Sequence, residues 1–430
     1  MTHQASAQRA AAPAKETSLW RNRNFMLLWG GQGAGTLGPR IAMVVLPLLA
    51  LETLHASAFQ VSLLTSLGWL PYLLFSLPAG VLADRLDQRW IMIFCDVARL
   101  LLILSVPLVA LGGGLSLWYL YAVVGVSGVL TVQFTVAYRS QLPRLVRGSQ
   151  LVDGNGKLGI VESLAELTGP GLGGALIGLV GTSRALFANV LTYALSALSL
   201  GLMRVPAAGR TAKGASARVP FKAAVGEGLT FVRHQPILRK LLICTSVSNF
   251  FVTATNAIAV TFMLRELHAS ATAVGLVFTA GSVGGLLTGI FARQIAGRVG
   301  SARVIWVSML LPGPLYFLMP LSSSGWGVAL YAVGLAALSA NSTLFNVASL
   351  SYRQIVCPPE LLSRVGAVYL WIAYGVIPLG ALFGGTLATG VGLRATLWVC
   401  ATGMWSAALF VVFSPLRKMR DVPLTAAVAG

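Results

Sequence analysis

Charged residues are scarce in this chain. Of its 430 residues only 10% are charged and just 12 are acidic, whereas 56% are hydrophobic. A chain with so few charges cannot cover a folded surface with groups that water solvates, and its mean hydropathy of +0.79 points the same way. An ordinary soluble protein is therefore excluded, and most of the molecule must face lipid.

Cysteine is also rare. The four cysteines, Cys95, Cys244, Cys357 and Cys400, show neither metal-ligand spacing nor paired positions, which excludes a zinc site and a disulfide framework. The chain has no Walker A pattern. The glycine-rich run 33–38 fits a dinucleotide-binding pattern but lies inside an apolar stretch rather than between a strand and a helix. We therefore expect no metal, no cofactor and no enzymatic activity.

Long apolar runs are what the sequence has in abundance. A helix of about 20 apolar residues crosses the roughly 30 Å hydrocarbon core of a bilayer, and the charge-free runs repeatedly reach that length. The fold class is thus predicted to be an all-α membrane protein. We predict twelve transmembrane helices, which start near residues 25, 59, 91, 115, 157, 185, 238, 273, 303, 326, 365 and 395.

The net charge of +19 is distributed as in a membrane protein rather than a nucleic-acid-binding protein. If the polar segment 1–24 is cytoplasmic, all but four of the 31 Lys and Arg fall at cytoplasmic positions; the exceptions are Arg40, Arg184, Arg265 and Arg394. This positive-inside asymmetry predicts that both termini are cytoplasmic. Segment 1–24 lacks the apolar core of a signal peptide. The basic segments can also contact anionic lipid headgroups.

The chain is an internal duplication. The run Leu-His-Ala-Ser-Ala at 54–58 recurs at 267–271, about half a chain length later, and each copy follows the first span of a six-span set. Two bundles in parallel repeat are typical of transporters whose halves rock about a site near the membrane midplane. The predicted organisation is a tail 1–24, a six-helix bundle 25–203, a cytoplasmic linker 204–237, a six-helix bundle 238–416 and a tail 417–430.

A short charged loop follows the second span. The segment 80–89 reads Gly-Val-Leu-Ala-Asp-Arg-Leu-Asp-Gln-Arg, and its Gly80, Asp84, Arg85 and Arg89 resemble motif A of the major facilitator superfamily. Glycine permits close approach of a neighbouring helix, and the opposite charges can form a latch between the two halves. The resemblance implies that this latch stabilises the outward-facing state. A charge cluster that only fixes topology is the alternative.

Span five carries a stripe of small residues. Gly156, Gly169, Pro170, Gly173 and Gly174 reproduce the spacing of motif C, which resembles the export-type antiporters of the same superfamily. Glycines clear one helix face, and proline removes a backbone donor and kinks the helix; ordinary tight packing is the alternative. With both motifs, the chain resembles the drug-efflux, macrolide-efflux and enterobactin-export branch. This implies the major facilitator fold of two pseudo-symmetric six-helix bundles.

Three ionisable residues lie inside predicted spans, where an uncompensated charge costs about 2.5–3.5 kcal/mol or more. Glu162 and Glu166 are one turn apart on one face of span five, and Arg40 lies deep in span one. We expect Arg40 to reach towards Glu166 and Glu162 to exchange protons; a static pair with a spare acid is the alternative. Asp96 and Arg99, at the start of span three, are interpreted as an intrahelical cytoplasmic pair.

Polar side chains follow the helices that line the cavity in this superfamily. They recur every three or four residues, which places each set on one helical face. The candidate substrate-cavity residues are Gln32, Thr36, Phe134, Tyr138, Asn249, Thr253, Asn256, Ser342 and Asn346. Hydroxyl groups in membrane helices often serve packing alone, whereas the asparagines favour the cavity. A pocket of mixed polar and aromatic groups suits an amphiphilic organic molecule rather than a hydrated ion.

These features predict a secondary active transporter: a proton-coupled antiporter that exports an amphiphilic small molecule by alternating access, as a monomer in a bacterial inner membrane. A lysophospholipid flippase or an importer on the same scaffold is the alternative within this class. A non-transporting membrane receptor or scaffold is the alternative from another class. The receptor or scaffold alternative predicts that neutralising Glu162 or Glu166 affects only the stability of the protein.

Overall fold

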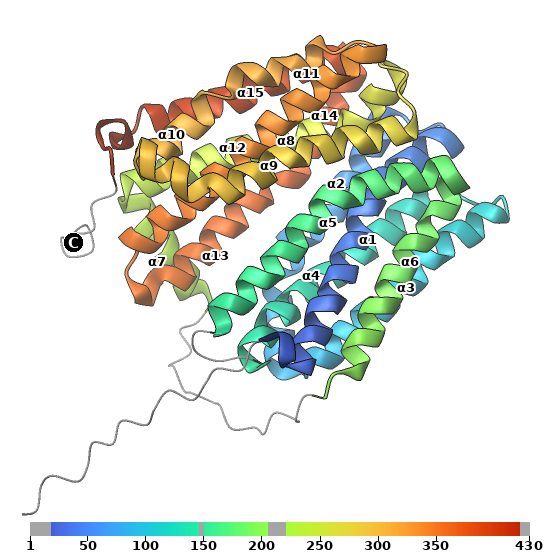
Figure 1. Cartoon of the computed structure of the whole chain (residues 1–430), viewed down its shortest axis with the longest axis horizontal. Helices are drawn as coiled ribbons and strands as arrows, with labels where there is room; N and C mark the ends of the chain where they lie inside the picture. The colour runs from blue at the N-terminus through green and yellow to red at the C-terminus, as the bar shows by residue number, and fades with distance from the viewer. Residues whose placement is uncertain (1–18, 146–149, 205–220, 422–430) are drawn as a thin grey trace, which may run out of the picture.

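The computed structural model describes residues 19–145, 150–204 and 221–421 (Figure 1). The secondary structure of these ranges is helical throughout, with short turns between the helices. The α-helices are α1 (Arg23–Thr53), α2 (Ala58–Arg85), α3 (Gln88–Leu111), α4 (Leu117–Leu145), α5 (Gln150–Val180), α6 (Thr182–Leu202), α7 (Phe221–His234), α8 (Pro236–Arg265), α9 (Ala271–Val299), α10 (Arg303–Leu310), α11 (Leu318–Leu321), α12 (Val328–Val356), α13 (Pro359–Gly375), α14 (Ile377–Val391) and α15 (Leu393–Val412).

The described residues contain twelve helical stretches that are long and apolar enough to cross a membrane, which confirms the predicted number. Two of these spans are broken. The ninth consists of α10, a 3₁₀ turn at Gly313–Phe317 and α11, and it breaks at Pro312. The eleventh consists of α13 and α14, which are separated at Val376, just before Pro378. Proline has no N–H to donate and clashes with the preceding turn, which disfavours a continuous helix at both positions.

The spans form two bundles that lie side by side. Figure 1 shows α1–α6, coloured blue to green, beside α8–α15, coloured yellow to red. The end of the molecule at which α6 runs towards α7 is here called the linker end. The opposite end, which holds the turns 54–57 and 266–270, is called the far end. Each bundle is continuous in sequence, as the duplication predicts.

The two bundles are joined at the far end. One apolar core there combines side chains of both halves, such as Leu48 of α1 and Phe262 of α8. Towards the linker end the core splits, among the described residues, into one cluster around Met92 in the first half and another around Ile305 in the second. The described part of the molecule is therefore held together at one end and divided at the other.

Glycine makes the close contact at the far end possible. Gly174 of α5 and Gly275 of α9 face each other so closely that a Cβ built on either would lie 2.9 Å from the other's Cα. Helix backbones in membranes approach this closely only through small residues. Arg265 adds a polar contact between the halves, because its guanidinium donates to the carbonyl oxygen of Ala56 at 2.8 Å.

The repeated five-residue segment forms the same corner in both halves. His55 and His268 adopt left-handed backbone conformations, with φ of 49° and 52°. The next amide then closes the helix end in the same way: Ala56 N donates to the carbonyl six residues back at 3.0 Å, and Ala269 N does so at 2.9 Å. The duplication is thus preserved in backbone geometry.

The predicted linker 204–237 contains an unpredicted helix, α7. Its Gly228 lies against the backbone carbonyl of Arg364 on α13, and the Arg364 guanidinium forms an ion pair with Glu227. Val232 is buried in a small apolar core that α7 shares with α13. This helix therefore belongs to the second half rather than to a solvated connection.

Candidate functional site

A pocket of about 100 Å³ lies where the two halves meet. It combines side chains from α1, α5, α8, α9 and α12, so that both halves contribute. The lining residues are Arg40, Met43, Glu166, Pro170, Asn256, Phe278, Ser282, Leu335 and Ser339. A site shared by two halves that can move against each other is where a transporter binds its substrate.

The charged part of the pocket is the pair that the sequence predicted. Arg40 lies just past the middle of the 31-residue helix α1, and Glu166 lies near the middle of the 31-residue helix α5. Arg40 Nη1 and Glu166 Oε1 are 3.5 Å apart, and their side chains are 42% and 59% exposed. Other protein groups therefore leave both charged side chains partly uncovered, and both line the pocket.

Small residues on α5 set the position of this pair. Gly169 lies directly against the Cβ of Arg40, and a Cβ built on Gly173 would lie 3.0 Å from the carbonyl oxygen of Ile41. A larger residue at either position would push α1 away from α5. The motif C stripe thus has a local role in placing Arg40, and through Gly174 it also forms part of the contact between the halves. The side-chain position of Gly156 lies outside the described residues.

The second half contributes uncharged groups to the pocket. Asn256 on α8 and Ser339 on α12 are polar, and Phe278 and Leu335 are apolar. Ser282 Oγ lies 3.3 Å from the carbonyl oxygen of Glu166, so a hydroxyl of α9 can hydrogen-bond to α5 across the two halves. Of the candidate cavity residues, Asn256 lies in the pocket. The sequence pattern missed Met43, Phe278, Ser282 and Leu335, because apolar and hydroxyl side chains are common everywhere in membrane helices.

Other candidate cavity residues lie outside this pocket. Asn249 donates through Nδ2 to the carbonyl oxygen of Ala373, at 2.9 Å, beside the break between α13 and α14. Its role in the structure is therefore to satisfy a carbonyl near a helix end. Further members that do not line the pocket are Gln32 and Thr253, which are buried, Thr36 and Ser342, which are half-buried, and Asn346, which is exposed. Glu162 is likewise exposed outside the pocket lining, one turn from Glu166.

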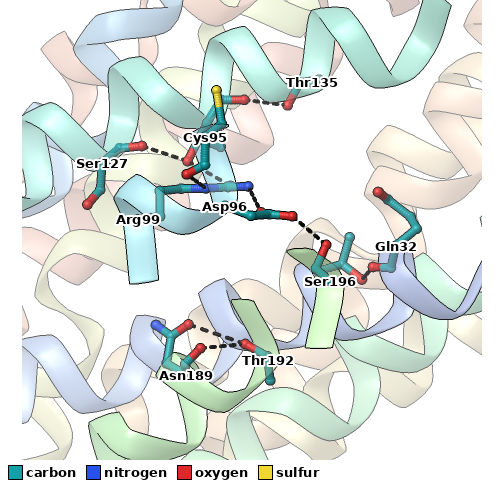
Figure 2. Close-up of polar contacts among 11 residues, drawn as sticks. Gln32, Cys95, Asp96, Arg99, Ser127, Thr135, Asn189, Thr192 and Ser196 are labelled. Atoms are coloured by element: carbon teal, nitrogen blue, oxygen red, sulfur yellow. Dashed lines mark hydrogen bonds and ion pairs between the residues drawn. The ribbon is translucent and has the colours of Figure 1, made fainter. Parts of the chain in front are cut away.

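A second charged pair lies inside the first bundle. Asp96 and Arg99 on α3 form an ion pair and are 0% and 2% exposed. Figure 2 shows Asp96 between Arg99 and Ser196 of α6, whose hydroxyl donates to Asp96 Oδ2 at 2.6 Å. The prediction of an intrahelical pair is confirmed, and the structure adds that the pair is buried. Asp96 lies about 12 Å into α3, at 1.5 Å per residue, and helices α4 and α6 cover the pair.

Aromatic rings hold the arginine of this buried pair. The guanidinium carbon of Arg99 lies 4.5 Å from the ring centroid of Phe134 and 4.6 Å from that of Tyr193. Each ring face attracts the cation. Phe134, a candidate cavity residue, is thus a partner of Arg99, and Tyr138 stacks on Phe134 with ring centroids 6.4 Å apart. Two opposite charges three residues apart, more than two turns into an apolar span, were the sequence signal for this cluster.

The motif A residues are described only in part. Gly80, Asp84 and Arg85 all belong to helix α2, but their surroundings lie outside the described part of the structure. Arg89 on α3 donates to two carbonyl oxygens at the end of α6, that of Leu200 at 2.8 Å and that of Gly201 at 2.6 Å. This arginine therefore binds the terminal carbonyls of a helix, where the helix dipole favours a cation.

Two six-span bundles in parallel repeat, joined at one end and sharing a central pocket, define a membrane transporter of the major facilitator fold. The solved structure of a variant of the nucleoside transporter NupG shows this fold, with a TM-score of 0.74 at 12% identity over 91% of this chain and all of that one. A family model described as transmembrane secretion effector matches residues 15–428. The chain belongs to this family of the major facilitator superfamily, and it is a multi-pass transporter rather than an enzyme.

Curated relatives cover nearly the whole chain. The multidrug efflux pump Tap of Mycolicibacterium fortuitum is 26% identical over 418 residues, which are 95% of this chain and 99% of that protein. Macrolide efflux protein A of Streptococcus pyogenes is 23% identical over 409 residues, 93% of this chain and 97% of that one. The resemblance to efflux proteins that the motifs suggested is therefore confirmed along the full length.

Proposed function

We propose that this protein exports an amphiphilic small molecule in exchange for protons. The observation that carries the proposal is the Arg40–Glu166 pair, which lies midway along α1 and α5, in a pocket shared by both halves and accessible from it. A charge held at this depth without a partner is costly, so ionisable groups there are candidates for function. The names of two relatives, a multidrug and a macrolide efflux protein, support export as the direction.

The pair provides a simple coupling step. A proton that binds to Glu166 removes its negative charge and leaves Arg40 without a counter-ion. The guanidinium of Arg40 can then bind another group, and the contact between α1 and α5 changes. Glu162, one turn away on α5 and exposed, is a second carboxylate that can accept a proton or a cationic group of the substrate. Proton binding and substrate release thus act on the same two helices.

The arrangement of the halves supports a cycle of alternating access. The far end is closed by close glycine contacts and a shared core, whereas the apolar cores towards the described linker end each belong to one half. The positive-inside asymmetry favours the linker end as the cytoplasmic end. With that orientation, the conformation corresponds to the inward-facing state, which loads substrate from the cytoplasm before export. Both termini are then cytoplasmic, and a bacterial inner membrane is the proposed location.

The chemistry of the pocket favours an amphiphile. Asn256, Ser282 and Ser339 offer hydrogen-bonding groups, while Phe278 and Leu335 offer apolar surface. A hydrated ion would gain nothing from the apolar side, because small-ion sites are built from converging oxygen ligands. An organic molecule with one polar and one apolar face can use both kinds of contact.

The test is extrusion of a panel of fluorescent amphiphiles from energised cells that produce the protein, with and without a proton ionophore. We expect Glu166→Gln to abolish extrusion, as the ionophore does, while the amount of protein in the membrane stays normal. Glu52→Gln is the matched control. Its carboxylate lies at the far end and accepts a hydrogen bond from Thr182, away from the pocket. Glu166→Gln cells that extrude as well as the parent would overturn the coupling role of Glu166.

A further inference from the structure

The first helix is packed by glycine against a polar face of α6. Gly35 has no side chain, and a Cβ built there would lie 3.2 Å from Ser196 Oγ. One turn further on, Gly38 lies directly against the side chains of Thr192 and Asn189. The spacing between α1 and α6 is therefore determined by where these α6 side chains point. The hydroxyl oxygen of Ser196 is the atom that lies nearest to the Cβ position of Gly35, so its placement sets how closely α1 can approach α6.

The buried ion pair fixes the orientation of Ser196. Its hydroxyl oxygen lies against the Gly35 position of α1 and at the same time donates to Asp96 Oδ2 of α3 at 2.6 Å. Asp96 is in turn held by Arg99. Arg99 is also bound by Thr131 at 3.4 Å, by the Cys95 carbonyl at 3.3 Å and by two aromatic rings. The oxygen that contacts α1 is thus held in place by a buried charge cluster.

The same stretch of α1 carries the charge in the pocket. Arg40 lies five residues beyond Gly35, about 7.5 Å along the helix axis at 1.5 Å per residue. On its other side α1 meets α5, where Gly169 lies against the Cβ of Arg40. Because α1 is confined between α6 and α5, a shift at Gly35 moves Arg40 relative to Glu166.

We propose that Asp96, Arg99 and Ser196 form a positioning device that fixes α1 against α6 and so aligns Arg40 with Glu166. The proposal rests on the proposed function only in so far as the Arg40–Glu166 pair takes part in transport. It gives the buried pair a role that its burial alone does not explain. A buried ion pair is weak evidence for stability, because apolar residues often replace one without loss.

The experiment uses a reporter cysteine in the pocket. Met43 lies less than one turn beyond Arg40, lines the same pocket and is 36% exposed. In Met43→Cys the new thiol is accessible, whereas the four native cysteines are buried and react slowly with maleimides. The rate of maleimide labelling in detergent reports the position of α1. It requires neither substrate nor proton gradient.

Two serine variants separate the positioning role from simple packing. Ser196→Ala removes the hydroxyl oxygen that contacts Gly35 and donates to Asp96, and it leaves the ion pair intact. Ser199→Ala is the matched control, because Ser199 donates directly to the Leu27 carbonyl of α1, at 2.6 Å, without contact to Asp96. We expect Ser196→Ala to change the labelling rate at residue 43 several-fold and Ser199→Ala to change it little. Equal rates in Ser196→Ala and the parent overturn the proposal, as does an equal change in both variants.

Transport provides the second readout. Where Glu166→Gln abolishes extrusion, we expect Ser196→Ala to reduce extrusion several-fold at normal protein amounts, and Ser199→Ala to extrude like the parent. If Glu166→Gln extrudes normally, the proposed coupling fails, yet the labelling result still decides the positioning of α1. If Glu166→Gln is inactive and Ser196→Ala matches the parent in both measurements, the positioning role alone is wrong.

Discussion

The first and second halves of this transporter share a connectivity but differ in where their charges lie. The spans of the first half contain four acidic residues: Glu52 at the end of the first span, and Asp96, Glu162 and Glu166 further from the span ends; Asp96 and Glu166 pair with arginines of the same half. The second half has no acidic residue within its spans, since no Asp or Glu occurs between Ala271 and Pro359 or between Leu361 and Arg420. The charged groups of the pocket thus come from the first half, and the second half contributes uncharged side chains to it.

The halves also differ in the continuity of their helices. The described spans of the first half run unbroken, whereas the second half contains the two broken spans, at Pro312 and at Val376. Irregular backbone at membrane depth is tolerated only where protein groups satisfy it. At the break at Val376, side chains of two neighbouring helices satisfy free carbonyl oxygens. Asn249 of α8 donates to the carbonyl of Ala373, and Ser66 of α2 donates to that of Pro378 at 3.1 Å. The two halves therefore differ in backbone continuity as well as in the placement of their acidic residues.

The largest effect should come from the buried charge of the first half. Arg99→Met leaves Asp96 without its cation, and an uncompensated buried charge costs about 3–5 kcal/mol. The counterpart is Arg353→Met in the second half. Arg353 lies over the ring of Tyr369, 3.8 Å from its centroid, a contact worth about 0.5–2 kcal/mol. Thermal unfolding in detergent, followed by circular dichroism, compares the two variants. Equal losses would remove the distinction between the halves.

A smaller effect is expected at the broken span. Asn249→Ala removes the donor to the Ala373 carbonyl beside the break, and we expect a loss of about 1 kcal/mol. Thr135→Ala in the first half is the control. Its hydroxyl binds only the carbonyl of Thr131, four residues back in the continuous helix α4, at 2.8 Å. Because that carbonyl keeps its helical position, little change should follow. The thermal unfolding assay compares the two variants. A Thr135→Ala variant as unstable as Asn249→Ala would argue against a special role for the break.

The smallest effect should be equal in the two halves. His55 and His268 hold left-handed conformations that glycine adopts without strain. His55→Gly and His268→Gly should each raise stability by about 0.5–1 kcal/mol, since the relief of strain exceeds the entropy that glycine adds to the unfolded chain. The melting temperatures of the two variants are the measurement. A gain in only one variant would mean that the repeated corners are not equivalent in energy.

The prediction of spans and of the Arg40–Glu166 pair succeeded for one physical reason. Lipid makes every charge and every interruption of an apolar run expensive, so these features are visible in the sequence without knowledge of neighbours. The close packing at Gly169, Gly173 and Gly174 could be expected for a similar reason, because glycine at helical spacing marks a close contact. The sequence did not show which residues contact Gly169 and Gly174. The contact of Gly169 lies in the first half, and that of Gly174 lies in the second.

The prediction was weaker where a residue's role depends on its neighbours. Asn249 was expected in the cavity but faces a helix break, because a polar residue satisfies whichever free carbonyl lies nearest. Phe278 and Leu335 carry no signal at all, since apolar side chains occur on every face of a membrane helix. The burial of Asp96 was not predicted because the helices that cover α3 cannot be located from α3 alone.

The sequence by itself determined the class of this protein: the twelve spans, the duplication and the presence of charge in the first half follow from the cost of polar groups in lipid. Only the tertiary structure decided which groups meet. It places Arg40 beside Glu166 in a pocket shared with the second half, and it encloses Asp96 and Arg99 among α3, α4 and α6. Helical periodicity gives the face of a residue but not the helix that packs against it, and function depends on that second fact.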